Sequence, residues 1–173
     1  YVGQRVLEVG AGTGTITQFL RGRDRVCATE FDSQYLQLLE RRFEHDPQIR
    51  ARMFDLDKPV PTDVAAERYD TVICLNVLEH IEDDGAALRR MCEVLEDDGR
   101  LVLLVPAHQF LFGAMDSAIG HFRRYARPSL RALLEREGFS LENDFMLNAL
   151  STPGWFLNGR ILRRTSVPGM QAR

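Results

Sequence analysis

The amino-acid sequence predicts an α/β fold, in which a doubly wound, mostly parallel sheet carries helices on both faces. Short apolar runs alternate along the chain with segments whose apolar residues recur at helical spacing. The first apolar run leads directly into three glycines at alternate positions, Gly10, Gly12 and Gly14. Glycines in this pattern let the backbone turn sharply after a strand and approach a bound molecule closely.

The apolar runs predict the strands of the sheet. We expect them at Arg5–Val9, Arg25–Glu30, Ile49–Phe54, Tyr69–Leu75 and Leu101–Val105. The fourth of these is almost continuously apolar, as a strand covered on both faces should be. A sixth strand, Phe139–Leu147, is weaker because acidic and amide side chains interrupt it.

Helices are predicted between these strands. We expect them at Thr15–Arg21, from Asp32 or Ser33 to about Glu44, over residues 82–96 and at Pro128–Glu137. Asp and Ser are preferred at the position before a helix, and proline is favoured in its first turn. Gly99 and Gly138 follow the last periodic residues, which is typical of a helix end.

Length and composition fit one globular domain. The chain has 173 residues, 45% hydrophobic and 27% charged, which excludes a disordered or fibrous protein. The net charge of −3 is unevenly spread, because basic side chains are in excess in residues 121–173. This excess is compatible with an anionic small-molecule acceptor and equally with a solvated surface. A nucleic acid partner is not expected, since no aromatic stacking platform accompanies the basic residues.

The cysteines and the hydropathy pattern predict a cytoplasmic protein. Cys27, Cys74 and Cys92 lie in apolar patterns, which is typical of reduced core residues rather than of a disulfide frame. The sequence shows no signal peptide and no apolar run near the ~20 residues of a membrane helix, so no stable membrane insertion is expected. The residue spacing indicates no metal cluster and leaves the oligomeric state open.

Ligands bind such sheets beyond the carboxyl ends of the strands, where the connecting loops converge. Glu30 ends the second strand, about twenty positions after Gly10, which is the place of a ribose-binding acid in nucleotide-binding domains. Its carboxylate can accept hydrogen bonds from both ribose hydroxyls. A solvated carboxylate at a strand end is the other interpretation.

The segment Glu8-Val9-Gly10-Ala11-Gly12-Thr13-Gly14 resembles motif I of the class I S-adenosylmethionine-dependent methyltransferases. A dinucleotide site would require a small residue where Thr15 stands, and it leaves Glu8 without a function. The segment Asn76-Val77-Leu78-Glu79-His80-Ile81 resembles a second motif of that family, which carries Leu-Glu-His after the fourth strand. The resemblance implies a Rossmann-like fold, S-adenosyl-L-methionine as cofactor and methyltransferase activity.

The resemblance also implies a role for each motif residue. In that family the first acidic residue and the glycine loop hold the amino acid end of the cofactor, while Asp55 and the Leu56 N–H would contact the adenine. The implied cofactor-binding residues are Glu8, Gly10, Ala11, Gly12, Gly14, Glu30, Phe31, Asp55, Leu56 and Asn76. Asp57 competes with Asp55 for the adenine contact. Glu79 and His80 are also compatible with a catalytic role, but His80 is expected to fix a loop.

The long connection 106–127 is the predicted substrate or lid loop, since long loops at the active edge of a sheet are usually functional. Its His-x-Arg-Arg-Tyr pattern resembles one branch of these methyltransferases, with many uncharacterised bacterial members. Attack on a sulfonium methyl requires alignment above all, and a general base helps when the acceptor is a hydroxyl. The candidate catalytic residues are His108, His121 and Tyr125, and the candidate substrate-binding residues are Arg123 and Arg124. A purely structural role for them stays open.

We therefore expect residues 1–150 to form an S-adenosylmethionine-binding methyltransferase domain and residues 151–173 a C-terminal amphipathic extension. No segment after Leu150 matches the last antiparallel strand of the family, so we expect this strand to be missing through truncation. The predicted reaction is in-line transfer of the methyl group to a small-molecule or lipid-like acceptor. A nicotinamide-dependent oxidoreductase and a non-catalytic S-adenosylmethionine-binding module are the alternatives.

Overall fold

The computed structural model describes residues 1–147. The chain divides into two compact units. The first unit comprises Tyr1–Leu78 and Asp83–Leu104, and the second comprises Glu79–Glu82 and the residues from Val105 onward. Within the described part, none of the helices has both the length and the apolar character needed to cross a membrane.

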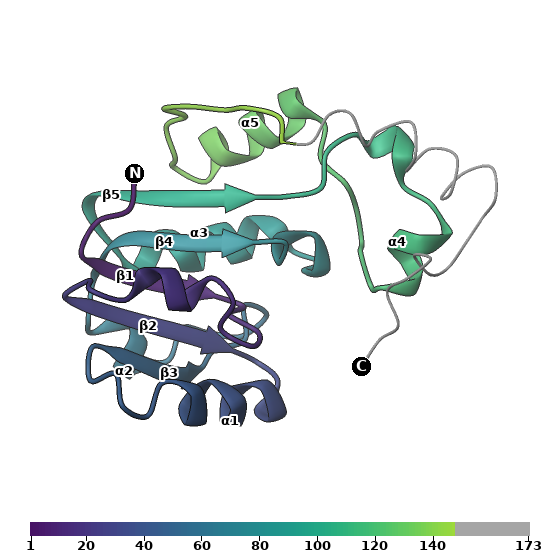
Figure 1. The fold of residues 1–173 in the computed structure, drawn as a ribbon. Coiled ribbons are helices and arrows are strands. Elements are labelled where there is room, and N and C mark those ends of the chain that lie inside the picture. Colours follow the sequence, from purple (N-terminus) through teal and green to yellow (C-terminus); the bar gives the residue numbers. More distant parts are fainter. Residues whose placement is uncertain (148–173) are drawn as a thin grey trace. The chain divides into compact units, whose positions relative to one another are not determined.

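The first unit is built around a five-stranded parallel sheet (Figure 1). Its strands are β1 (Arg5–Val9), β2 (Arg25–Glu30), β3 (Ile49–Met53), β4 (Tyr69–Leu75) and β5 (Leu95–Leu104), in the spatial order β3-β2-β1-β4-β5. Leu7 of β1 pairs with Cys27 on one side and Val72 on the other, so β1 is the central strand. This arrangement confirms the predicted α/β fold.

Helices connect these strands. They are η1 (Thr17–Leu20), α1 (Ser33–Arg42), α2 (Thr62–Ala65) and α3 (Asp84–Val94), where η denotes a 3-10 helix. The Asp32 carboxylate caps α1, because it accepts a hydrogen bond from the backbone N–H of Gln34 at 2.7 Å. The strand order reverses direction after β3, so right-handed connections place α2 and α3 on the opposite face of the sheet from η1 and α1.

Two predicted elements of the first unit have other bounds in the structure. The helix expected at Thr15–Arg21 is only the short η1, because the threonines around it disfavour a helix and Gly22 (φ +86°) turns the chain away. β5 begins at Leu95 rather than Leu101, since Leu95 already pairs with Tyr69 before a shift in the strand register. The short helix α2 is an additional element that the sequence does not predict, and the predicted elements keep their order.

The described elements of the second unit are short helices. They are η3 (Gln109–Leu111), α4 (Ala114–Ala118) and α5 (Arg127–Arg136), and η2 (Leu78–His80) contributes its last residues. The 106–127 connection folds back on itself: the His108 N–H donates to the Tyr125 carbonyl at 3.0 Å, and the Tyr125 N–H donates to the Pro106 carbonyl at 2.9 Å. Helix α5 confirms the helix predicted at this place.

The prediction of a sixth strand at Phe139–Leu147 is wrong. Residues 139–146 have no regular secondary structure. The Phe139 N–H donates to the Leu134 carbonyl of α5 at 2.9 Å, and the carboxylate of Asp144 pairs with Arg127. Asp144, one of the polar residues that weakened the strand pattern, thus holds this segment to α5. The predicted extension 151–173 lies outside the described residues.

Candidate active site

The three glycines of the loop after β1 all have positive φ angles, but their surroundings differ. A Cβ on Gly10 (φ +70°) would lie 2.5 Å from Val77, and one on Gly14 (φ +78°) would lie 2.5 Å from Phe43. These two positions therefore need glycine for close packing as well as for their backbone conformation. A Cβ on Gly12 (φ +56°) would meet nothing within 4 Å. The backbone at Gly12 is thus open to a bound molecule.

Glu30 joins the glycine loop to the loop after β2. Its carboxylate is 5% exposed, and Oε2 accepts a hydrogen bond from the Gly12 N–H at 2.9 Å. Oε1 accepts from the backbone N–H groups of Phe31 at 2.9 Å and Asp32 at 3.2 Å. Each carboxylate oxygen has two lone pairs, so Oε2 keeps capacity for a ribose hydroxyl next to Gly12.

Glu8 is a buried carboxyl in the middle of β1. It is 4% exposed, and the Thr17 hydroxyl donates to its Oε2 at 2.6 Å. Burial raises the pKa of Glu8 to about 7, although the hydrogen bond from Thr17 acts in the opposite direction. A cationic amino group nearby would favour the ionised form. Sequence reasoning missed Thr17, a polar residue in the segment that follows the glycines.

The residues expected near the adenine and the methionine portion follow β3 and β4. Asp55 pairs with Lys58 at 2.8 Å and accepts from the Asp57 N–H at 3.0 Å, and the hydrogen bond from Lys58 holds its pKa below the usual range. The side chain of Leu56 is buried. Asn76 is exposed and has a positive φ of +54°, and its N–H donates to the Leu104 carbonyl at 2.9 Å. Such a conformation at a non-glycine residue is common at functional sites.

These residues fit a cofactor that combines a nucleoside with an amino acid. The open backbone at Gly12 and the Glu30 carboxylate lie at the end of neighbouring parallel strands, where doubly wound sheets bind nucleosides. The buried carboxyl of Glu8 offers a partner for an ammonium group. The first unit is therefore a nucleoside-cofactor-binding domain of the doubly wound class.

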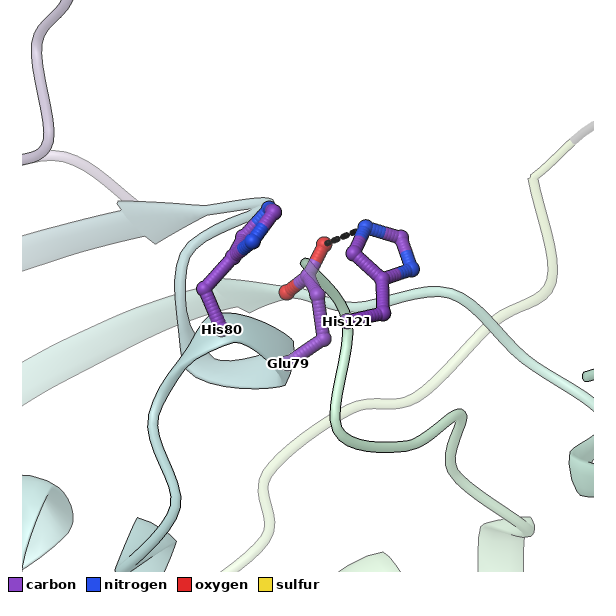
Figure 2. A group of neighbouring side chains, drawn as sticks. All are labelled: Glu79, His80 and His121. Atoms are coloured by element: carbon purple, nitrogen blue, oxygen red, sulfur yellow. Dashed lines mark ion pairs between the residues drawn. The ribbon is translucent and has the colours of Figure 1, made fainter. Parts of the chain in front are cut away.

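A second group of polar side chains lies within the second unit. Figure 2 shows the side chains of Glu79, His80 and His121 close together. His121 Nε2 is 3.8 Å from Glu79 Oε1, and the two imidazole rings meet edge to face with centroids 4.6 Å apart. On its other side, His121 Nδ1 is 3.0 Å from Asp116 Oδ1, which also accepts from Arg124 Nε at 2.7 Å.

Burial controls the charges in this group. Glu79 is 1% exposed, and burial raises its pKa to about 7 while the positive charge of Arg124 lowers it. Burial also holds the pKa of His121 below its usual range, although the hydrogen bond with Asp116 raises it. The sequence motif singles out Glu79, but only the fold brings its carboxylate beside His121, which is distant in the sequence.

The structure places the other candidate catalytic and substrate-binding residues as follows. His108 has a positive φ of +66°, and its ring lies 5.2 Å from that of Phe110. Tyr125 is buried, and its backbone bonds hold the 106–127 connection together. Arg123 donates to the Glu82 carbonyl at 2.6 Å, and Arg124 is buried against Asp116. Their roles toward an acceptor stay predictions.

Comparison with known proteins gives the family. Residues 2–143 match a family described as "Methyltransferase domain". A ubiquinone biosynthesis O-methyltransferase of Xanthomonas euvesicatoria is 25% identical over 183 residues, covering 95% of this chain and 73% of that protein. A solved S-adenosylmethionine-dependent methyltransferase from Mesorhizobium loti has a TM-score of 0.68 at 19% identity, over 89% of this chain and 84% of its own. The YcgJ protein of Bacillus subtilis has a TM-score of 0.68 at 18% identity. The match covers 80% of this chain and 63% of the YcgJ chain.

The chain belongs to this family of methyltransferase domains. It is a class I methyltransferase domain, and S-adenosyl-L-methionine is its cofactor. The two solved structures show that the fold is shared. This membership confirms the predicted family and leaves the nicotinamide-dependent alternative without support.

Proposed function

We propose that this chain transfers the methyl group of S-adenosylmethionine to a hydroxyl oxygen of a small organic acceptor. The binding of the methyl donor is the donor half of this proposal. The observation that carries it is the open backbone at Gly12 beside the Glu30 carboxylate. The alignment of 95% of the chain with an O-methyltransferase supports oxygen as the methylated atom. The acceptor itself follows from neither observation.

The donor-side residues have the task of binding and alignment. Bound S-adenosylmethionine supplies a methyl carbon already activated by its sulfonium. Holding that carbon in line with the attacking oxygen can lower the activation barrier by roughly 7–11 kcal/mol, so the protein needs little further chemistry. In this proposal Glu30 accepts hydrogen bonds from the ribose, Asp55 accepts one from the adenine amino group, and Glu8 pairs with the ammonium group.

The acceptor side depends on the second unit. His108, half-buried in the 106–127 connection, is the candidate base that takes the hydroxyl proton. An anionic group on the acceptor would have to share the donors of Arg123 and Arg124, which already bond within their own unit. Tyr125 supports this connection through its backbone, and its hydroxyl is proposed to contact the acceptor.

The proposal extends to the setting of the reaction. We infer a cytoplasmic protein that takes a small molecule rather than a nucleic acid. The three cysteines support a reducing compartment, since Cys27, Cys74 and Cys92 form no disulfide. Cell fractionation with an antibody against the native protein tests this location.

Calorimetric titration tests the donor half. We expect S-adenosylhomocysteine to bind, and NAD and NADP not to bind. Glu30→Ala should weaken the binding of S-adenosylhomocysteine by about 1–3 kcal/mol, the range for losing hydrogen bonds to a charged group. Glu44→Ala, at an exposed carboxylate beyond α1, is the matched control and should bind normally. Equal affinities of the two variants would remove Glu30 from the site.

Product analysis tests the acceptor half. The chain is incubated with labelled S-adenosylmethionine and a panel of hydroxylated aromatic compounds, half of them carrying a carboxylate. We expect label in a methyl ether, identified by its NMR shift, and higher kcat/KM for the carboxylates. A new carbon–methyl or nitrogen–methyl bond would contradict the choice of oxygen. Cofactor binding without label in any compound would favour the non-catalytic alternative.

A further inference from the structure

Three ligand-type side chains meet in the second unit. One atom from each of Glu79, His80 and His121 lies within 4.8 Å of the others (Figure 2). One carboxylate and two imidazoles form a ligand set that divalent first-row transition metals favour. Zn²⁺ holds such nitrogen and oxygen atoms at about 2.0–2.2 Å, so its ligands lie about 3–4 Å from one another. His80 is the exposed member of the set, so its side chain has room to adjust when an ion binds.

One oxygen of the buried Glu79 carboxylate has no hydrogen-bond partner among the described residues. Its side chain is 1% exposed, and Oε2 is a buried oxygen without a hydrogen bond among the described residues. A buried polar atom that is left unsatisfied costs about 1–3 kcal/mol, and more if it is charged. A bound cation removes this cost, because it coordinates the carboxylate directly.

His121 is held in the orientation of a metal ligand. Its Nδ1 faces Asp116 Oδ1 at 3.0 Å, which leaves Nε2 directed toward Glu79 at 3.8 Å. A carboxylate on the second ring nitrogen is the usual support of a metal-binding histidine, since it fixes the tautomer and the ring plane. Arg124 in turn holds Asp116 through Nε at 2.7 Å. Asp116 is therefore engaged by His121 and Arg124 and supports the cluster from outside.

The backbone fixes the two segments that carry these side chains. The Phe122 N–H donates to the Glu79 carbonyl at 2.8 Å, and Arg123 donates to the Glu82 carbonyl at 2.6 Å. The residues joined by these bonds and the three ligand-type side chains all belong to the same compact unit. The backbone that carries the cluster is thus held by hydrogen bonds within its own unit.

We propose that Glu79, His80 and His121 bind one divalent first-row transition-metal ion of the Zn²⁺ type. Three protein ligands leave a coordination position open, as in catalytic rather than structural zinc sites. A hydroxyl oxygen of the acceptor is a suitable fourth ligand, since a cation lowers the pKa of a hydroxyl bound to it. This last role rests on the proposed function, whereas the site itself does not.

Titration of the whole chain with a metal ion tests the site. The protein is stripped with a chelator and then titrated with Zn²⁺ by calorimetry and with Co²⁺ by visible absorption. We expect one ion per chain and the absorption bands of a low-symmetry Co²⁺ site. We expect at least about a tenfold loss of Zn²⁺ affinity in each of three variants, Glu79→Gln, His80→Gln and His121→Gln. Tenfold is the lower end of the loss seen when even a residue that only supports a metal ligand is removed. His45→Gln, which removes an exposed histidine beside Glu44, is the control and should bind as the native chain does.

The outcomes separate the metal site from the proposed reaction. His80 is exposed, so His80→Gln should keep the fold, as circular dichroism will show, even if the buried variants lose it. Asp116→Asn should lower the affinity for Zn²⁺ about 10–100-fold, although all three proposed ligands remain. Absence of saturable binding, or equal affinity of His80→Gln and His45→Gln, overturns the site. S-adenosylhomocysteine titrated into the same samples reports on the donor half independently, because its proposed contacts involve none of these residues.

Discussion

Gly12 is the one glycine of the motif whose surroundings are open, and this makes it a probe for bound cofactor. Gly12→Val should abolish binding of S-adenosylhomocysteine, because the new side chain fills the space in front of the loop. The left-handed backbone at this residue (φ +56°) also strains valine by about 1–2 kcal/mol.

Gly22 supplies the control for that strain. It too has a positive φ (+86°) with nothing within 4 Å of an added Cβ, but it lies in the turn before β2. Gly22→Val should lose comparable stability in thermal denaturation and still bind S-adenosylhomocysteine normally. If both variants bind equally, the loop does not contact the cofactor.

Glu8 gives the stability of the protein a pH dependence with a definite sign. Its folded pKa of about 7 lies above the ordinary value of 4.5, because burial penalises the charged carboxylate. The folded state therefore holds the proton more tightly, so this contribution to stability is complete below about pH 4.5 and is lost as the pH rises toward 7.

Urea denaturation at about pH 5 and about pH 8 measures this effect. We expect the free energy of unfolding of the native chain to fall relative to that of Glu8→Gln by up to about 3 kcal/mol over this range. Glutamine keeps an oxygen for the Thr17 hydroxyl and cannot ionise. Other groups titrate alike in both proteins, so parallel pH profiles would show that Glu8 ionises normally.

At the scale of elements, β1, β2 and β4 have the bounds that the sequence predicts, because each is a short apolar run that the sheet buries. The strand predicted at Phe139–Leu147 does not form, and the carboxylate of Asp144, one of the residues that interrupt its apolar pattern, instead pairs with Arg127. The 3-10 helix η1 is shorter than predicted, since apolar spacing alone does not report how poorly threonine supports a helix.

The start of α1 offers a test of local sequence signals. Asp32 accepts a hydrogen bond from the Gln34 N–H at 2.7 Å, so Asp32→Ala should destabilise the protein by about 1 kcal/mol in urea denaturation. Gln37→Ala, at an exposed position inside the same helix, is the control and should change stability by less than about 0.5 kcal/mol. Equal losses would mean that the cap contributes no stability of its own.

At the scale of the whole molecule, the two candidate sites differ in how far the sequence could reveal them. Gly12 follows β1 and Glu30 ends β2, so the rule that parallel strands gather their loops at one edge is enough to predict that they meet. Glu79 and His121 come from separate segments of the second unit, and their contact depends on the path of the 106–127 connection. Apolar spacing carries no information about that path.

This division predicts that the two ligands protect different parts of the chain. The proposed contacts of S-adenosylhomocysteine lie in the first unit, and those of Zn²⁺ lie in the second. Hydrogen exchange should therefore slow around Gly12 and Glu30 with S-adenosylhomocysteine, and around Glu79 and His121 with Zn²⁺. At a free concentration 100 times its dissociation constant, a ligand adds about 2.7 kcal/mol to the stability of the state that binds it. Protection by S-adenosylhomocysteine confined to Glu79 and His121 would contradict the donor site, and protection by Zn²⁺ confined to the glycine loop would contradict the metal site.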